Sequence, residues 1–125
     1  MVKHRIPGTG GTGAIDRTVL GEWLDEDDAA IDALLVVFRD SAQAQFTRLR
    51  QALDRADLAE FAQTAHRLRG GALAMGAPGL ARAATVAEEA GKARNAEACA
   101  ASMADLEVQM DRMAADVSRE RPSDR

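Results

Sequence analysis

Two histidines occur in the 125-residue sequence, and His66 stands where an imidazole could do chemistry. It lies in a stretch with helical periodicity, at the flank of the apolar stripe. Ala62 and Gly70, four residues before and after it, share its face and are very small, and Gly71 widens the gap. A glycine inside a helix costs about 1 kcal/mol relative to alanine. The pair therefore serves something other than helix stability, and bare surface suits the close approach of another macromolecule.

Two further residues are predicted to act on this ring. Arg69 lies three residues after His66 on the same side, where a cation can stabilise an anion attached to the ring. If a hairpin turns at about Ala77, His66 and Glu88 lie eleven residues to either side, each roughly 16 Å from the turn. A carboxylate that accepts from Nδ1–H leaves Nε2 with a free lone pair. Glu88 is thus predicted to orient His66 as a nucleophile.

Five helical stretches are predicted to position these side chains, at about residues 15–24, 27–55, 57–75, 78–90 and 95–117. Asp16 and Asp57 are predicted N-caps, whereas Gly76 and Gly91 are predicted to end helices. The apolar stripes are expected to form the core, including Leu35, Phe38, Phe61, Leu68, Leu80, Cys99, Leu106 and Met113. Either Val36 or Val37 is expected to be covered and the other to be exposed.

The composition favours an all-α fold. Hydrophobic residues make up 46% of the chain, but aromatic residues only 3%, and tyrosine is absent. Alanine, the best helix former, is abundant, while the residues that β-sheets need are scarce. We expect an antiparallel up-down four-helix bundle with a short additional N-terminal helix. Residues 1–14 would form a flexible arm, 15–118 the bundle and 119–125 a polar tail.

The net charge, the cysteine content and the lengths of the apolar runs argue against several classes of partner and location. A net charge of −4 without a basic block argues against nucleic-acid or anionic-membrane partners. The single cysteine cannot form an internal disulfide, and no apolar run is long enough to cross a membrane, so we expect a cytoplasmic protein. Gly8, Gly10 and Gly13 fit a dinucleotide-binding string, but Pro7 precedes them in place of a strand. We therefore do not expect a phosphate-binding loop there, and His4 is expected to be solvated and idle.

The run AHRLRGG at residues 65–71, followed by Gly76-Ala77, Leu80-Ala81 and Glu88, resembles the histidine-containing phosphotransfer (HPt) family of two-component phosphorelays. That family's pattern is approximately A-H-x-L-K-G-[S/A], and the likeness extends over about residues 15–117. The resemblance implies that His66 accepts a phosphoryl group from a receiver-domain phospho-aspartate and passes it to another receiver. Arg69 then matches the family's basic residue near the phosphoryl group, and Glu88 the residue that hydrogen-bonds the imidazole.

The resemblance also implies the partners. These are receiver domains of a hybrid histidine kinase and of a response regulator, which are expected to dock on Gly70, Gly71, Ala62 and Gln63. No cofactor or metal is expected on this chain, and Mg²⁺ is expected in the receiver's acidic pocket. The chain has no ATP-binding element, so we interpret it as a phosphocarrier rather than an enzyme, and as a monomer.

Four residues depart from the family pattern. Arg69 replaces the commoner lysine, and its planar fork has a different reach. Gly71 stands where serine is frequent, which removes a hydroxyl contact. Ala84 and Ala87 replace a cysteine and a leucine, and these small residues predict close helix packing.

Two alternatives compete with the carrier interpretation. The first is a four-helix binding module that regulates a histidine kinase or receiver without carrying phosphate. The second is a metal or haem bundle, which the count of ligands disfavours, because His66 is the only histidine in the predicted bundle and Cys99 belongs to another part of the core.

Overall fold

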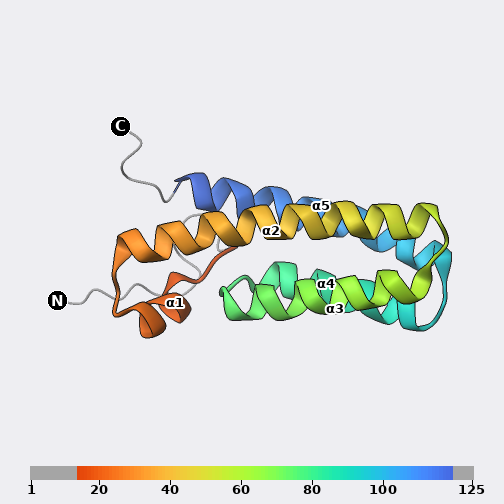
Figure 1. Cartoon of the computed structure of the whole chain (residues 1–125), viewed down its shortest axis with the longest axis horizontal. Helices are drawn as coiled ribbons and strands as arrows, with labels where there is room; N and C mark the ends of the chain where they lie inside the picture. The colour runs from red at the N-terminus through yellow and green to blue at the C-terminus, as the bar shows by residue number, and fades with distance from the viewer. Residues whose placement is uncertain (1–13, 120–125) are drawn as a thin grey trace.

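The computed structural model describes residues 14–119, which form five helices and no strand (Figure 1). The predicted arm, with His4 and the glycine string, lies outside the described residues except for Ala14, and the tail lies outside them except for Arg119. The helices are α1 (Arg17–Leu24), α2 (Asp28–Asp54), α3 (Leu58–Ala74), α4 (Pro78–Lys92) and α5 (Ala96–Arg119).

Aspartate and asparagine side chains begin four of the five helices. The carboxylates of Asp16, Asp27 and Asp57 accept hydrogen bonds from backbone N–H groups in the first turns of α1, α2 and α3. The amide oxygen of Asn95 does the same for α5, accepting from the N–H of Ala98 at 3.0 Å. Such caps satisfy donors that have no partner within the helix. The predicted caps Asp16 and Asp57 are confirmed.

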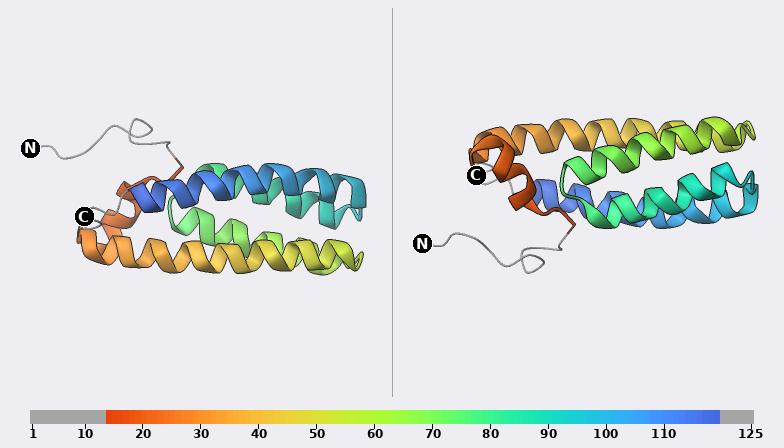
Figure 2. Two further views of the ribbon diagram at one scale, coloured as in Figure 1. Left: turned by 90° about the horizontal axis from the view of Figure 1, so that it is seen from above. Right: turned by 90° about the horizontal axis from the view of Figure 1, so that it is seen from below.

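The four long helices lie side by side along the long axis of the molecule (Figures 1 and 2). Contacts join α2 to α3 and α5, and join α4 to the same two helices, with the most extensive contact between α3 and α4. The α2–α3 and α4–α5 turns lie at one end of the molecule (Figure 1). At the other end α2 and α5 extend beyond the α3–α4 turn, and α1 packs into the space that remains (Figure 1).

The predicted apolar stripes line the inside of this arrangement. Large side chains that are almost completely buried include Leu35, Phe61, Leu68, Leu80, Leu106 and Met113, and Cys99 is also buried. Val36 packs partly against the core, whereas Val37 is 62% exposed, so the expectation that one of the two is covered is confirmed. No helix within residues 14–119 is long and apolar enough to cross a membrane.

The predicted end of the fourth helix at Gly91 is wrong. The helix continues through Gly91 to Lys92, and Ala93 is its C-cap. Gly91 is buried, and a Cβ atom added there would lie 2.9 Å from both the Cβ and the backbone nitrogen of Ala62. Glycine therefore permits close approach of α3 and α4. By contrast, Gly76 follows α3 with a φ of 76°, the left-handed conformation that glycine adopts readily.

Hydrogen bonds fasten the segment before α1 to the end of the bundle. The carboxylate of Asp116 on α5 accepts from the backbone N–H groups of Ala14 and Ile15, at 3.1 and 3.2 Å. The N–H of Asp16 donates to the carbonyl of Gly76 at 2.6 Å. These hydrogen bonds therefore join the segment before α1 to both α5 and the α3–α4 turn.

Candidate functional site

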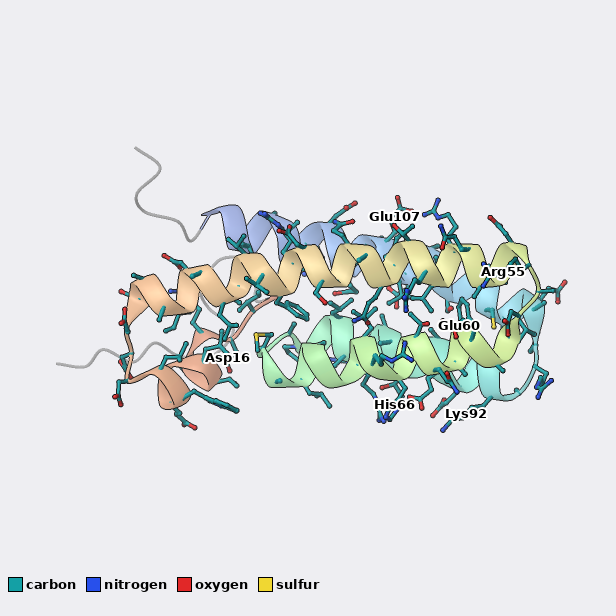
Figure 3. All side chains as sticks on the ribbon, in the orientation of Figure 1. Asp16, Arg55, Glu60, His66, Lys92 and Glu107 are labelled. Carbon is teal, nitrogen blue, oxygen red and sulfur yellow. The ribbon has the colours of Figure 1, made fainter. Side chains whose placement is uncertain are left out.

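His66 projects from the middle of α3 on the side that faces away from α2 (Figure 3). Its side chain is 60% exposed, although the neighbouring Ala65 and Leu68 are buried. Its Nδ1 lies 3.0 Å from Oε2 of Glu88 on α4, so the contact expected from the hairpin geometry is present. The ring is thus held at one nitrogen by a neighbouring helix while its other side faces solvent.

Glu88 is a buried carboxylate whose oxygens contact three basic side chains. Its side chain is only 8% exposed. In addition to His66, Nε of Arg69 lies 3.4 Å from Oε1 and Nζ of Lys92 lies 3.2 Å from Oε2. Burial raises the pKa of the Glu88 carboxyl, but hydrogen bonds from Lys92 and His66 and the charges of Lys92 and Arg69 outweigh it, so its pKa lies below the ordinary 4.5. Glu88 is therefore ionised at neutral pH.

An ionised Glu88 determines which ring nitrogen of His66 carries the proton. A carboxylate can only accept, so its hydrogen bond with Nδ1 requires Nδ1–H. Nη2 of Arg69 also lies 3.1 Å from Nδ1 but has no acceptor there in this tautomer. The guanidinium then pairs with Glu88 through Nε. In the neutral ring, Nε2 of His66 then keeps its lone pair, which is the arrangement of an oriented nucleophile.

The predicted docking residues differ in what surrounds them. Gly70 is exposed, and a Cβ atom added there would meet nothing within 4 Å. Gln63 is exposed, whereas Ala62 is 9% exposed beneath Gly91. A Cβ atom at Gly71 would lie 3.2 Å from the ring of Phe38, so this glycine faces α2. Close packing between helices therefore explains why residues 62 and 71 are small. At Gly70, by contrast, the absence of a side chain leaves the surface open.

A groove of about 390 Å³ runs beside the imidazole between α3 and α4. Its lining consists of Ala62, Gln63, His66, Arg67, Glu88 and Lys92. Sequence reasoning missed Lys92, because it placed the end of the helix at Gly91. The signal was available, since Lys92 follows Glu88 by four residues and so shares its face. Arg69 and Lys92 thus contact the buried carboxylate, and Arg67 lines the groove beside the exposed imidazole.

Ala84 and Ala87, the departures on the fourth helix, are both completely buried. They lie on the same helix as Gly91, where α4 closely approaches Ala62 of α3. Small side chains along α4 therefore bring Glu88 within hydrogen-bonding distance of His66. Within residues 14–119, no group of three or more histidine, cysteine, aspartate or glutamate side chains is arranged to hold a metal ion.

The molecule is thus a helical bundle that presents an oriented, solvent-accessible histidine beside exposed helix surface at Gly70. A family model described as the Hpt domain matches residues 33–119, and the chain belongs to this family. Hpt domains carry phosphoryl groups on histidine in two-component phosphorelays and interact with receiver domains. A comparison with curated proteins found no match to the chain.

Proposed function

We propose that the protein accepts a phosphoryl group on Nε2 of His66 from the phospho-aspartate of one receiver domain and donates it to the aspartate of another. The observation that carries this proposal is the 3.0 Å contact between Nδ1 of His66 and the buried, ionised Glu88. That contact keeps a proton on Nδ1, which leaves Nε2 as the nitrogen that can act as the nucleophile. Hybrid histidine kinases and response regulators would supply the two receivers.

The proposed reaction is an in-line displacement at phosphorus. The Nε2 lone pair forms the N–P bond while the P–O bond to the aspartate breaks, and the aspartate leaves as a carboxylate. The proton on Nδ1 stays in place, so the imidazole becomes a phosphorylated cation. Glu88 then accepts from a cationic donor, which strengthens the hydrogen bond. The reverse displacement on a second receiver restores the neutral ring.

Arg69 and the receiver supply the remaining charge stabilisation. The guanidinium of Arg69 lies beside the ring and can rotate from Glu88 toward phosphoryl oxygens. Mg²⁺ would belong to the acidic pocket of the receiver. The basic surface of Arg67, Arg69 and Lys92 complements the acidic pocket of such a partner.

The receiver would dock over the face of α3 that carries His66. Gly70 leaves open space one turn away, and Leu73, a further turn along the same face, is 59% exposed. Gln63 and the groove floor at Ala62 would complete the contact. Gly71 faces Phe38 of α2, so its contribution to docking would be indirect, through the position of α3. An exposed apolar residue beside a small one suits a transient protein interface.

The proposal extends to the chain as a whole. We propose that residues 15–118 form an antiparallel up-down four-helix bundle with α1 added, flanked by an arm at 1–14 and a tail at 119–125. It would act as a cytoplasmic monomer that carries phosphate without catalysing its own phosphorylation.

A binding module that regulates a kinase or receiver without phosphorylation is the second candidate. The same groove and exposed Leu73 would serve it, but it would not need the tautomer that Glu88 imposes on His66. Replacing His66 distinguishes the two functions, because a regulator that never carries phosphate would act normally without this ring.

The test incubates the full chain with a phosphorylated receiver domain and measures phosphate on the chain. We expect acid-labile, base-stable label on the wild-type protein and none on His66→Gln. An unlabelled wild-type chain, or equal labelling of His66→Gln, would overturn the proposal. Unchanged relay activity of His66→Gln between two receivers would favour the binding module.

A further inference from the structure

A second groove, of about 360 Å³, lies between α4 and α5. Its lining shares no residue with the groove beside His66. Arg82, which lines it, precedes Glu88 by six residues, and this turns the two side chains about 120° apart around α4. A molecule bound between α4 and α5 would therefore leave His66 uncovered.

The groove contains an apolar strip along α4. Ala83 lines it and is buried, and Val86, on the next turn, lines it and is 53% exposed. A Cβ atom added at Gly79 would lie 2.5 Å from Oε1 of Gln109, so the Gln109 side chain of α5 lies against the bare backbone of α4. The strip is thus open to solvent at Val86.

Two arginines line the same groove, Arg82 on α4 and Arg112 on α5, and both are exposed. Neither side chain forms an ion pair or a hydrogen bond with any of residues 14–119. Asp105 also lines the groove, so its two cations outnumber its one acid. A positively charged groove with an apolar strip is complementary to a segment that carries carboxylates near an apolar side chain.

The contact between Gly79 and Gln109 determines how far apart the arginines lie. Arg82 is three residues beyond Gly79 toward the α4–α5 turn, and Arg112 is three residues beyond Gln109 in the opposite direction. At about 1.5 Å per residue, these offsets separate the two Cα atoms by about 9 Å along the bundle. An extended peptide rises about 3.3 Å per residue, so carboxylates three positions apart match this separation.

Val86 extends the same register. It lies four residues beyond Arg82, on the side away from Arg112, which corresponds to about 6 Å along α4. An apolar side chain two positions beyond the carboxylate at Arg82 would therefore reach it.

We propose that the α4–α5 groove binds an extended acidic segment of a partner protein, with carboxylates on Arg82 and Arg112 and an apolar side chain on Val86. This inference goes beyond the proposed function, because it does not involve His66. The groove would hold a partner while the phosphoryl site stays open.

The chain's own N-terminal segment fits the groove less well than an acidic partner. It precedes Ala14, which also lines the groove. Residues 1–13 include Lys3 and Arg5 but no acidic residue. Repulsion between like charges would therefore oppose their binding beside Arg82 and Arg112.

The test titrates the full chain, labelled with nitrogen-15, with the blocked peptide Leu-Ser-Glu-Ser-Ser-Glu and with its reverse sequence, and measures Kd from the amide shifts. Matched peptides carry glutamine in place of glutamate. Arg82→Gln and Arg112→Gln each remove one cation, and Arg94→Gln, exposed in the α4–α5 turn outside the groove, controls for lost charge. Val86→Gln removes the apolar contact, and Val108→Gln, 51% exposed but outside the lining, is its control.

We expect one of the two acidic peptides to bind, with shifts confined to α4 and α5. Arg82→Gln and Arg112→Gln should each raise its Kd about two- to fivefold, the effect of losing an exposed ion pair. Val86→Gln should also weaken binding, whereas the two control variants should match wild type.

No shift along α4 and α5 with either peptide, or equal binding of the glutamine peptides, would overturn the proposal. Shifts of residues 2–13 caused by Arg112→Gln in the free chain would assign the groove to that segment instead. A dimer in sedimentation equilibrium that Arg82→Gln abolishes would assign it to a second copy of the chain. Either result would also overturn the proposal, and neither bears on phosphorylation of His66.

Discussion

At the scale of single residues, the proposed chemistry depends on one hydrogen bond. Glu88 determines the tautomer of His66, and it can do so because it is both buried and ionised. Burial alone would favour its neutral form, and a protonated carboxyl could donate a hydrogen bond to Nδ1 and reverse the tautomer. Lys92 and Arg69 oppose this effect of burial, because their charges favour the ionised carboxylate and so keep Glu88 an acceptor.

The lowered pKa of Glu88 gives a pH dependence whose sign is fixed. Its folded-state pKa lies below the ordinary 4.5 of the unfolded chain, so its contribution to stability is complete above 4.5 and is lost as pH falls through the folded-state pKa. Denaturant unfolding of wild type and Glu88→Gln from pH 7 to 3 should show the wild-type advantage constant above about 4.5 and shrinking below it.

Glu89→Gln removes a carboxylate from an exposed position of the same helix and controls for the change in net charge. A wild-type advantage that grew on acidification would contradict the description of Glu88 as an ionised acceptor.

At the scale of helices, small residues set the distance between α3 and α4. Gly70 and Gly91 have opposite surroundings. Gly70 has open space where a Cβ would be, whereas at Gly91 the Cβ and backbone of Ala62 occupy that space. The same substitution should therefore have opposite effects at the two positions.

Gly70→Ala should raise the free energy of unfolding by up to about 1 kcal/mol, because alanine is the better helix former. Gly91→Ala should lower it by about 1–3 kcal/mol, because α3 and α4 must separate. Gly91→Ala should also slow phosphoryl transfer, since the separation moves Glu88 and Lys92 away from His66. Equal effects of the two variants in urea denaturation would contradict this account of the packing.

Much of this arrangement could be predicted from the sequence, and the reasons differ by residue. Equal distances from the α3–α4 turn place Glu88 opposite His66, because both helices rise by the same amount per residue. Gly91 misled the prediction because a glycine looks the same in sequence whether it ends a helix or allows close packing. Because the helix was expected to end at Gly91, Lys92 was not predicted to be part of the site. No sequence pattern predicts the hydrogen bonds from Ala14 and Ile15 to Asp116, since they join residues about a hundred positions apart.

At the scale of the whole molecule, the site and the attachment of α1 lie in different regions. His66 is near the middle of α3, whereas Asp16 marks the end of the bundle where α1 packs (Figure 3). Asp116, which is 3% exposed, holds two backbone N–H groups at that end. Stability and phosphoryl transfer should therefore respond separately to changes there.

Asp116→Ala should lower the free energy of unfolding by about 1–3 kcal/mol, because it leaves buried N–H donors without their acceptor. Asp111→Ala, at an exposed position of the same helix, should change stability far less. Both variants should transfer phosphate at the wild-type rate below their unfolding temperatures. Loss of transfer in folded Asp116→Ala would show that the two regions are coupled.

In the proposed reaction, His66 receives the phosphoryl group on Nε2 while Nδ1 keeps its proton toward Glu88. Nitrogen-15 and phosphorus-31 NMR of the chain after incubation with a phosphorylated receiver tests it directly, because the spectra identify which ring nitrogen is bonded to phosphorus. We predict a single phosphohistidine at position 66, bonded through Nε2, with Nδ1 protonated. Phosphorus on Nδ1, or on any other residue, would contradict the account.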